Sequence, residues 1–293
     1  MTKAAGREQV FPIVEAFGYA ADADTPESRA ARKTQTCPFT RTLCEKMVQY
    51  RYGYCSLTYA AADDENQRRT YAVCDHRLDG GPVDTAIVDH FGARAKYVQI
   101  IPEVSIAEPR MSFDYSAITL DASGTITDVA VIETQAIDIR GGGVGPAWRA
   151  WLDGSSDRWR EYYTAEALTK KRKDKVTYGV NMANIYKRLG LQVAVKGTFL
   201  KGIKVPLYVV MQHRPFEYLR RRITFQEANG AWDLTFMTFD YTGKKNADGT
   251  LEFAHVQTIR STLADYVAAM TAASMSDRGA FLDRIKRKAG LTD

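Results

Sequence analysis

Residues 111–140 read MSFDYSAITLDASGTITDVAVIETQAIDIR, and this stretch decides the fold that we expect for the chain. Segments 113–120 and 125–139 are rich in β-branched and aromatic residues, which predicts two β-strands. Between them, residues 121–124 (DASG) have the composition of a tight turn. The sequence therefore predicts a β-hairpin.

The predicted hairpin brings two acidic residues together. With the turn centred on Ser123 and Gly124, Asp114 lies opposite Glu133, and Cβ atoms of opposed residues are about 4.5–5.5 Å apart. Gln135 shares the face of Glu133 because side chains alternate along a strand. Two carboxylates this close favour Mg²⁺, which can activate a water for in-line attack on a phosphate. The alternative is an amphipathic hairpin whose acidic face is solvated.

All four cysteines of the chain lie in one window, at Cys37, Cys44, Cys55 and Cys74. In a reducing compartment such a cluster indicates a metal site more often than a disulfide framework. Four thiolates suit tetrahedral Zn²⁺ or a mononuclear iron. The spacing is irregular and contains no Cys-x-x-Cys pair, so the alternative is that some of these are buried free cysteines that pack as small apolar residues.

Polar and basic residues after the hairpin are candidates for phosphate or base contacts. Segment 181–196 predicts a helix with amide and basic side chains on one face at every fourth position. Four consecutive cations occupy residues 170–173, and Arg140 precedes a glycine-rich segment, 141–145. The alternatives are a solvated charge run and a flexible connector. The DNA-binding candidates are Arg140, Lys171, Arg172, Asn181, Asn184, Arg188, Gln192 and Lys196.

The composition describes an ordinary globular protein. The 293 residues are 45% hydrophobic and 26% charged, with a net charge of +5 that is compatible with nucleic acid without requiring it. Segment 1–9 is polar and no apolar run reaches the length of a membrane span, so we expect a soluble, cytoplasmic protein without a membrane partner.

The acidic motif resembles the active site of the PD-(D/E)xK nucleases. Phe113 and Asp114 are followed by a Glu-x-Gln motif at Glu133 and Gln135, the variant in which Gln replaces the usual Lys. The segments FDYSA, ETQAID and NMANIYKR, together with the cysteine window, resemble restriction endonucleases of the NotI type in the same order over residues 17–268. The Pro that usually opens the motif is absent, because Ser112 and Phe113 precede Asp114.

This resemblance implies a fold and a set of roles. The fold is an α+β / α/β mixed sheet flanked by helices, with a helical and four-cysteine metal-binding region at 1–100 and a nuclease core carrying DNA-binding and dimerisation helices at 101–293. Asp114 and Glu133 bind catalytic Mg²⁺, Gln135 is a catalytic orienting group, and the four cysteines hold one structural Fe or Zn per subunit.

The implied activity is that of a type II restriction endonuclease. Such an enzyme cleaves duplex DNA at a palindromic site, here GC-rich, as a homodimer, and a cognate DNA methyltransferase is expected in the same system. Two alternatives are a non-catalytic four-cysteine DNA-binding regulator and a nicking or repair nuclease of the same fold. The first predicts that binding persists without divalent metal, and the second predicts cleavage of one strand.

The remaining segments have patterns typical of single elements. Thr25 and Pro26 indicate the start of a helix that runs to Lys33. Further helices are predicted at 10–19, 82–96, 148–168, 261–270 and 281–288, and further strands at 97–101, 204–212, 232–241 and 251–256.

Overall fold

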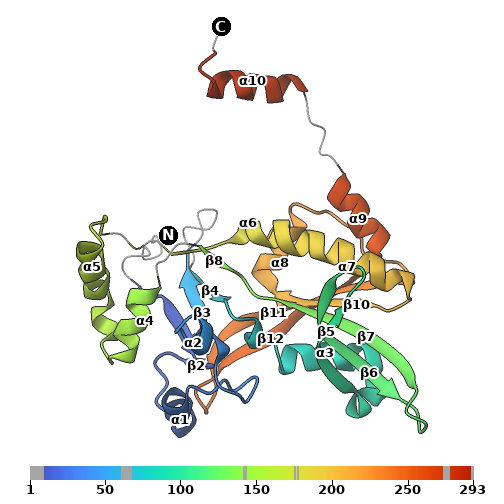
Figure 1. Ribbon diagram of the computed structural model, residues 1–293, viewed down its shortest axis with the longest axis horizontal. Helices are drawn as coiled ribbons and strands as arrows, with labels where there is room; N and C mark the ends of the chain where they lie inside the picture. Colours follow the sequence, from blue (N-terminus) through green and yellow to red (C-terminus); the bar gives the residue numbers. More distant parts are fainter. Residues whose placement is uncertain are drawn as a thin grey trace.

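A six-stranded mixed sheet lies at the centre of the protein (Figure 1). The computed structural model describes residues 10–60, 68–140, 144–174, 176, 178–272 and 278–291. The polar segment 1–9 and the glycine run 141–143 considered above lie outside the described residues. The strand order is β12-β11-β10-β7-β6-β5. The strands are β5 (Gln99–Ile106), β6 (Met111–Leu120), β7 (Ile126–Gln135), β10 (Leu207–Gln212), β11 (Leu234–Lys245) and β12 (Leu251–Ser261).

The sheet combines antiparallel and parallel pairing. Strands β5, β6 and β7 are antiparallel neighbours, β10 runs parallel to both β7 and β11, and β12 returns antiparallel to β11. A parallel neighbour requires a crossover connection, which the helices between β7 and β10 provide. This arrangement confirms the predicted mixed sheet flanked by helices.

Helices cover both faces of the sheet, which explains why β10 is buried throughout. Tyr208 and Val210 face one hydrophobic cluster, which contains the apolar residues of α3. Leu207 and Val209 face the other, which contains apolar residues of α7, α8 and α9. The helices are α3 (Gly81–Phe91), α7 (Gly190–Gly202), α8 (His213–Arg220) and α9 (Leu263–Thr271).

The hairpin of β6 and β7 has the register that the turn predicts. Tyr115 pairs with Ile132, and the register continues to Thr119 and Asp128. Gly124 occupies the turn with φ of 83°, a conformation that glycine adopts without a steric penalty. The prediction of one strand over 125–139 is wrong, because β7 ends at Gln135. The chain then leaves the sheet, and β8 (Ile139–Arg140) pairs with β9 (Gly179–Val180).

The N-terminal region contains a sheet that the sequence did not predict. Its four strands have the order β2-β1-β3-β4, and the predicted helix at 10–19 is wrong. Phe17 and Gly18 turn the chain with positive φ between β1 and β2, and a Cβ on Gly18 would lie 2.1 Å from Pro38. The strands are β1 (Ile13–Ala16), β2 (Tyr19–Ala20), β3 (Tyr54–Tyr59) and β4 (Arg69–Ala72).

A buried ion pair ties this region to the long β11–β12 hairpin. Glu15 of β1 is fully buried and accepts a hydrogen bond of 3.0 Å from Arg77. The Arg77 guanidinium also donates to the Leu251 carbonyl, and it lies over the rings of Tyr241 and Phe253. Residues of both regions belong to one hydrophobic cluster. The N-terminal region is therefore packed directly on the core around the central sheet.

Most of the other predicted helices are present. Thr25 caps α1 (Pro26–Thr34) in a capping box with Ser28. The predicted helix at 181–196 is interrupted: α6 (Met182–Asn184) and α7 flank a π-helical turn, η5 (Ile185–Leu189). The remaining helices are α2 (Glu45–Gln49), η2 (Asp75–Arg77), η3 (Gly92–Tyr97), α4 (Gly145–Leu152), η4 (Ser156–Arg158), α5 (Trp159–Thr169) and α10 (Arg278–Lys288). No described helix is both long enough and apolar enough to cross a membrane.

Candidate active site

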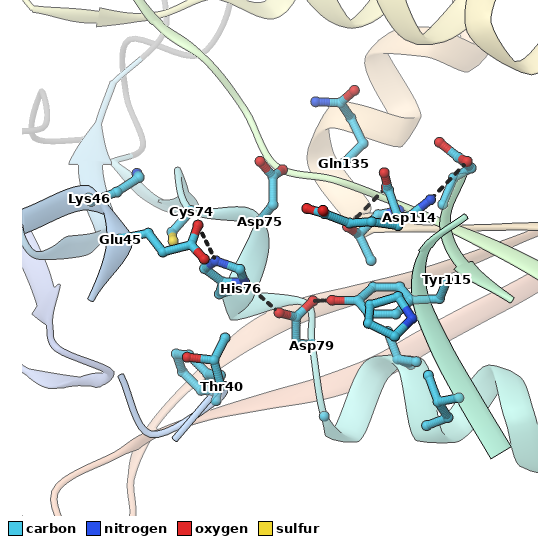
Figure 2. A pocket seen from close by; sticks show the side chains of 18 of the residues that line it. Thr40, Glu45, Lys46, Cys74, Asp75, His76, Asp79, Asp114, Tyr115 and Gln135 are labelled. Atoms are coloured by element: carbon cyan, nitrogen blue, oxygen red, sulfur yellow. Dashed lines mark hydrogen bonds and ion pairs between the residues drawn. The ribbon is translucent and has the colours of Figure 1, made fainter. Parts of the chain in front are cut away.

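A cavity of about 980 Å³ opens where β6 and β7 separate from each other. One wall is formed by these strands and by α7, and the other by segments of the N-terminal region that follow Cys44 and Cys74 (Figure 2). Six residues singled out from the sequence line the cavity besides Cys74, namely Asp114, Glu133, Gln135, Arg188, Gln192 and Lys196.

Asp114 and Glu133 are held together at the point where the β6–β7 ladder ends. Beyond the pair Tyr115–Ile132, the Thr134 N–H donates to Asp114 Oδ2 at 2.9 Å, and the Asp114 N–H donates to Glu133 Oε1 at 3.4 Å. Each carboxylate thus accepts a backbone N–H of the opposite strand. This reciprocal bonding explains why both acids stay at the mouth of the hairpin.

The electrostatics of the pair favour the arrival of a cation. Burial and repulsion from Asp114 raise the pKa of Glu133 to about 7, although Lys196 favours its charged form. Burial also raises the pKa of Asp114, against the hydrogen bonds from Thr134 and the charge of Lys196. Asp75 adds to the repulsion on Asp114. A divalent cation would relieve this repulsion, because it lowers the cost of holding both carboxylates charged.

The acid pair fits Mg²⁺ by its chemistry. Mg²⁺ is commonly bound through one or two carboxylates, with water and phosphate in the other positions, and the cavity leaves room for both. No group of three or more His, Cys, Asp or Glu side chains among the described residues is arranged as a complete metal cage. Asp114 and Glu133 would therefore supply the protein ligands, and the remaining positions would go to water and substrate.

Lys196 reaches the acid pair from α7. Its Nζ lies 2.5 Å from Glu133 Oε2, and the two side chains are 13% and 9% exposed. The sequence predicted that Lys196 contacts DNA as one of a row of polar side chains. In the structure its side chain instead points into the cavity and contacts Glu133. Gln135 lines the same cavity, but its Nε2 donates to the Ala136 carbonyl at 2.6 Å.

The opposite wall of the cavity contains polar residues that the sequence reasoning missed. His76 Nδ1 and Asp79 Oδ2 are 2.6 Å apart, and the Tyr115 hydroxyl donates to Asp79 Oδ1 at 2.6 Å (Figure 2). The hydrogen bond with Asp79 raises the pKa of His76. Asp75 accepts the Ala136 N–H at 2.8 Å. One feature of the sequence could have indicated these residues: Asp75 and His76 directly follow Cys74, which was already a candidate metal ligand.

The other DNA-binding candidates fall into two groups. Arg188 and Asn184 both contact the Asp138 carboxylate beside the cavity, the former at 3.2 Å. The second group does not line the cavity. Lys171 is exposed, Arg172 contacts Glu166 on α5, Asn181 donates its N–H to the Asp138 carbonyl, and Arg140 lies in β8. The predicted roles of both groups in DNA binding stay predictions.

The four cysteines are all buried and free. The Cys55 sulfur accepts the Gly18 N–H at 3.2 Å, and nearby backbone N–H groups favour the charged forms of Cys44 and Cys74. Such hydrogen bonds suit thiolates, whereas burial raises the pKa of the Cys74 thiol to about 11 and favours the protonated form. The described thiols do not form a metal cage as they stand, so the structure does not show the four-cysteine metal module.

The fold and the site define a mixed α and β protein with a paired-carboxylate cavity at the edge of a hairpin. No protein-family model and no curated protein matches the chain.

Proposed function

We propose that the chain is a Mg²⁺-dependent endonuclease of the type II restriction class that hydrolyses phosphodiester bonds of duplex DNA. The observation that carries the proposal is the pair formed by Asp114 and Glu133, which reciprocal hydrogen bonds hold in a cavity next to Lys196. The resemblance of these residues to the PD-(D/E)xK motif supports the same chemistry. A palindromic, GC-rich site, a homodimer and a cognate DNA methyltransferase belong to this proposal.

The side chains of the cavity have distinct roles in the proposed reaction. Asp114 and Glu133 would hold the divalent ion, which, when bound, supplies a Lewis acid for the phosphate and lowers the pKa of a coordinated water. Without a bound cation the two carboxylates repel the DNA backbone, so binding and cleavage both depend on divalent metal. Arg188 is 59% exposed at the cavity wall and would contact a phosphate.

The four cysteines would hold one structural Fe or Zn in this proposal. The donor chemistry supports it, since four buried thiols lie within one region and the Cys55 sulfur accepts the Gly18 N–H. The metal would require the thiols to lose their protons and close around it. No catalytic step depends on this metal.

Cleavage of phage DNA tests the proposed function. Purified protein is incubated with phage DNA and Mg²⁺ beside Glu133→Ala and beside Glu161→Ala, a control at an exposed carboxylate of α5 that pairs with Arg158. We expect discrete fragments from the wild type and from the control, and none from Glu133→Ala. Sequencing of the fragment ends then gives the site.

Two further gel assays with the same protein separate the alternatives, one of DNA binding and one of plasmid cleavage. A non-catalytic regulator would retard the DNA in a gel equally with Mg²⁺ and with EDTA, and it would cut nothing. A nicking or repair nuclease would convert supercoiled plasmid to the open circle without producing linear DNA. Either outcome would contradict the restriction endonuclease.

A further inference from the structure

The strand that carries Glu133 does not bring a cation to the acid pair. Gln135, one pleat further along β7, directs its amide Nε2 to the Ala136 carbonyl. Two partly buried carboxylates consequently require positive charge from another element. The structure supplies it from α7, where Lys196 Nζ contacts Glu133 Oε2.

The packing of α7 fixes the direction in which Lys196 points. Val193 and Leu200 of this helix are buried in the core. Gly197 directly follows Lys196, and a Cβ added to it would lie 2.6 Å from Leu263 of α9. The helix α7 is therefore packed closely on α9. The Phe113 ring, 5.7 Å from the Lys196 ammonium, covers it from the side of β6. The packing of α7 and the Phe113 ring therefore hold the Lys196 side chain in a defined position in the wall of the cavity.

We propose that Lys196 is the catalytic cation of the site and that it acts on the scissile phosphate. This inference rests on the proposed nuclease function. Its ammonium holds Glu133 in the free protein and contacts a non-bridging oxygen of the phosphate in the complex. There it stabilises the charge that grows as the water oxygen bonds to phosphorus.

The proposed step is a plain hydrolysis. One P–O bond forms from the attacking water, and the P–O bond to the leaving sugar oxygen breaks. The water loses a proton to solvent, and the leaving oxygen takes one from solvent. Lys196 transfers no proton and stays charged throughout, so its contribution is to the transition state and is separable from DNA affinity.

Single-turnover cleavage tests this role. The rate on a fragment that the wild type cuts is measured at rising enzyme concentration, which gives both a saturated rate and a half-saturating concentration. We expect Lys196→Met to lower the saturated rate by about 100- to 1000-fold, the loss typical of a donor to a developing charge, with half-saturation changed by less than about threefold. Lys201→Met is the matched control, because Lys201 lies on the same helix, is 48% exposed and pairs with Asp233.

A second variant separates a catalytic loss from misfolding. Lys196→Arg keeps the charge and should retain a measurable part of the rate, and circular dichroism melts show whether each variant is folded. If Lys196→Met cuts at the wild-type rate, the inference is overturned while the proposed function stands. If only the half-saturating concentration rises, Lys196 is a DNA anchor and the inference is also overturned. If the wild type cuts no DNA, the proposed function falls and this role falls with it.

Discussion

Replacing Glu133 by Gln is expected to stabilise the protein at pH 8 in the absence of divalent metal. Glu133 is 9% exposed and lies beside a second carboxylate, and its pKa rises from the ordinary 4.5 to about 7. Its charged form is therefore disfavoured in the folded state. The Glu133→Gln substitution would keep the shape of the side chain and remove the charge.

The magnitude follows from the pKa. A rise of about 2.5 pKa units corresponds to about 3 kcal/mol of unfolding free energy at pH values above both pKa values, since each unit is about 1.4 kcal/mol. Because Asp114 shares the repulsion and Lys196 can move, we expect about 1–3 kcal/mol. For a chain of this size that is a rise of roughly 2–10 °C in Tm.

The sign of the pH dependence is fixed by the direction of the shift. A carboxyl whose folded pKa is raised contributes its stability below the unfolded pKa and loses it as pH rises through the folded pKa. The wild type should therefore lose stability between about pH 4.5 and pH 7 relative to Glu133→Gln, and the two should converge at the acidic end of this range.

The assay is urea denaturation in EDTA at several pH values, repeated with Mg²⁺. Glu161→Gln on α5 serves as the control. Because the Glu161 carboxylate is exposed, this substitution should leave the free energy of unfolding close to that of the wild type. Mg²⁺ at pH 8 should stabilise the wild type and not Glu133→Gln. A Glu133→Gln variant that is less stable than the wild type at pH 8, or a difference that does not change with pH, would refute the reasoning.

Three further outcomes are expected. Asp114→Asn should abolish cleavage while the melting curve stays cooperative, and cleavage by this variant would exclude Asp114 as a metal ligand. Elemental analysis should find one Fe or Zn per chain in the wild type and a loss of metal in Cys55→Ser; a metal-free wild type would contradict the four-cysteine site. Arg77→Met should lower the free energy of unfolding, measured by urea denaturation, by about 3–5 kcal/mol, because it leaves the buried Glu15 without its cation. A decrease below about 1 kcal/mol would show that this ion pair contributes little to stability.

The local patterns of the sequence predicted local structure well where a single element decides the outcome. The register of the β6–β7 hairpin follows from its turn, because the side-chain period of a strand is two and the turn sets which residues meet. The start of α1 follows from Thr25 and Pro26, which satisfy the free N–H groups of the first helical turn. These choices depend on neighbours within a few residues.

Segment 10–19 shows where such reasoning stops. Its apolar spacing predicts a short helix, yet it forms β1 and β2. The segment pairs with β3, and only a glycine at position 18 leaves room for the side chains of Pro38 and Phe39. Both partners come from residues more distant in the chain. A spacing rule over ten residues contains no information about them.

The sequence by itself determined that Asp114 and Glu133 meet, since one hairpin brings them together. Only the tertiary structure decided that Lys196, from the row of polar residues on the 181–196 helix, would reach this pair and that Asp75 and His76 would form the facing wall. Lys196 and Glu133 are 63 residues apart. Their contact depends on how closely α7 is seated on α9 and on the stacking of its Phe199 on Phe113 of β6, and both are contacts between segments distant in the chain.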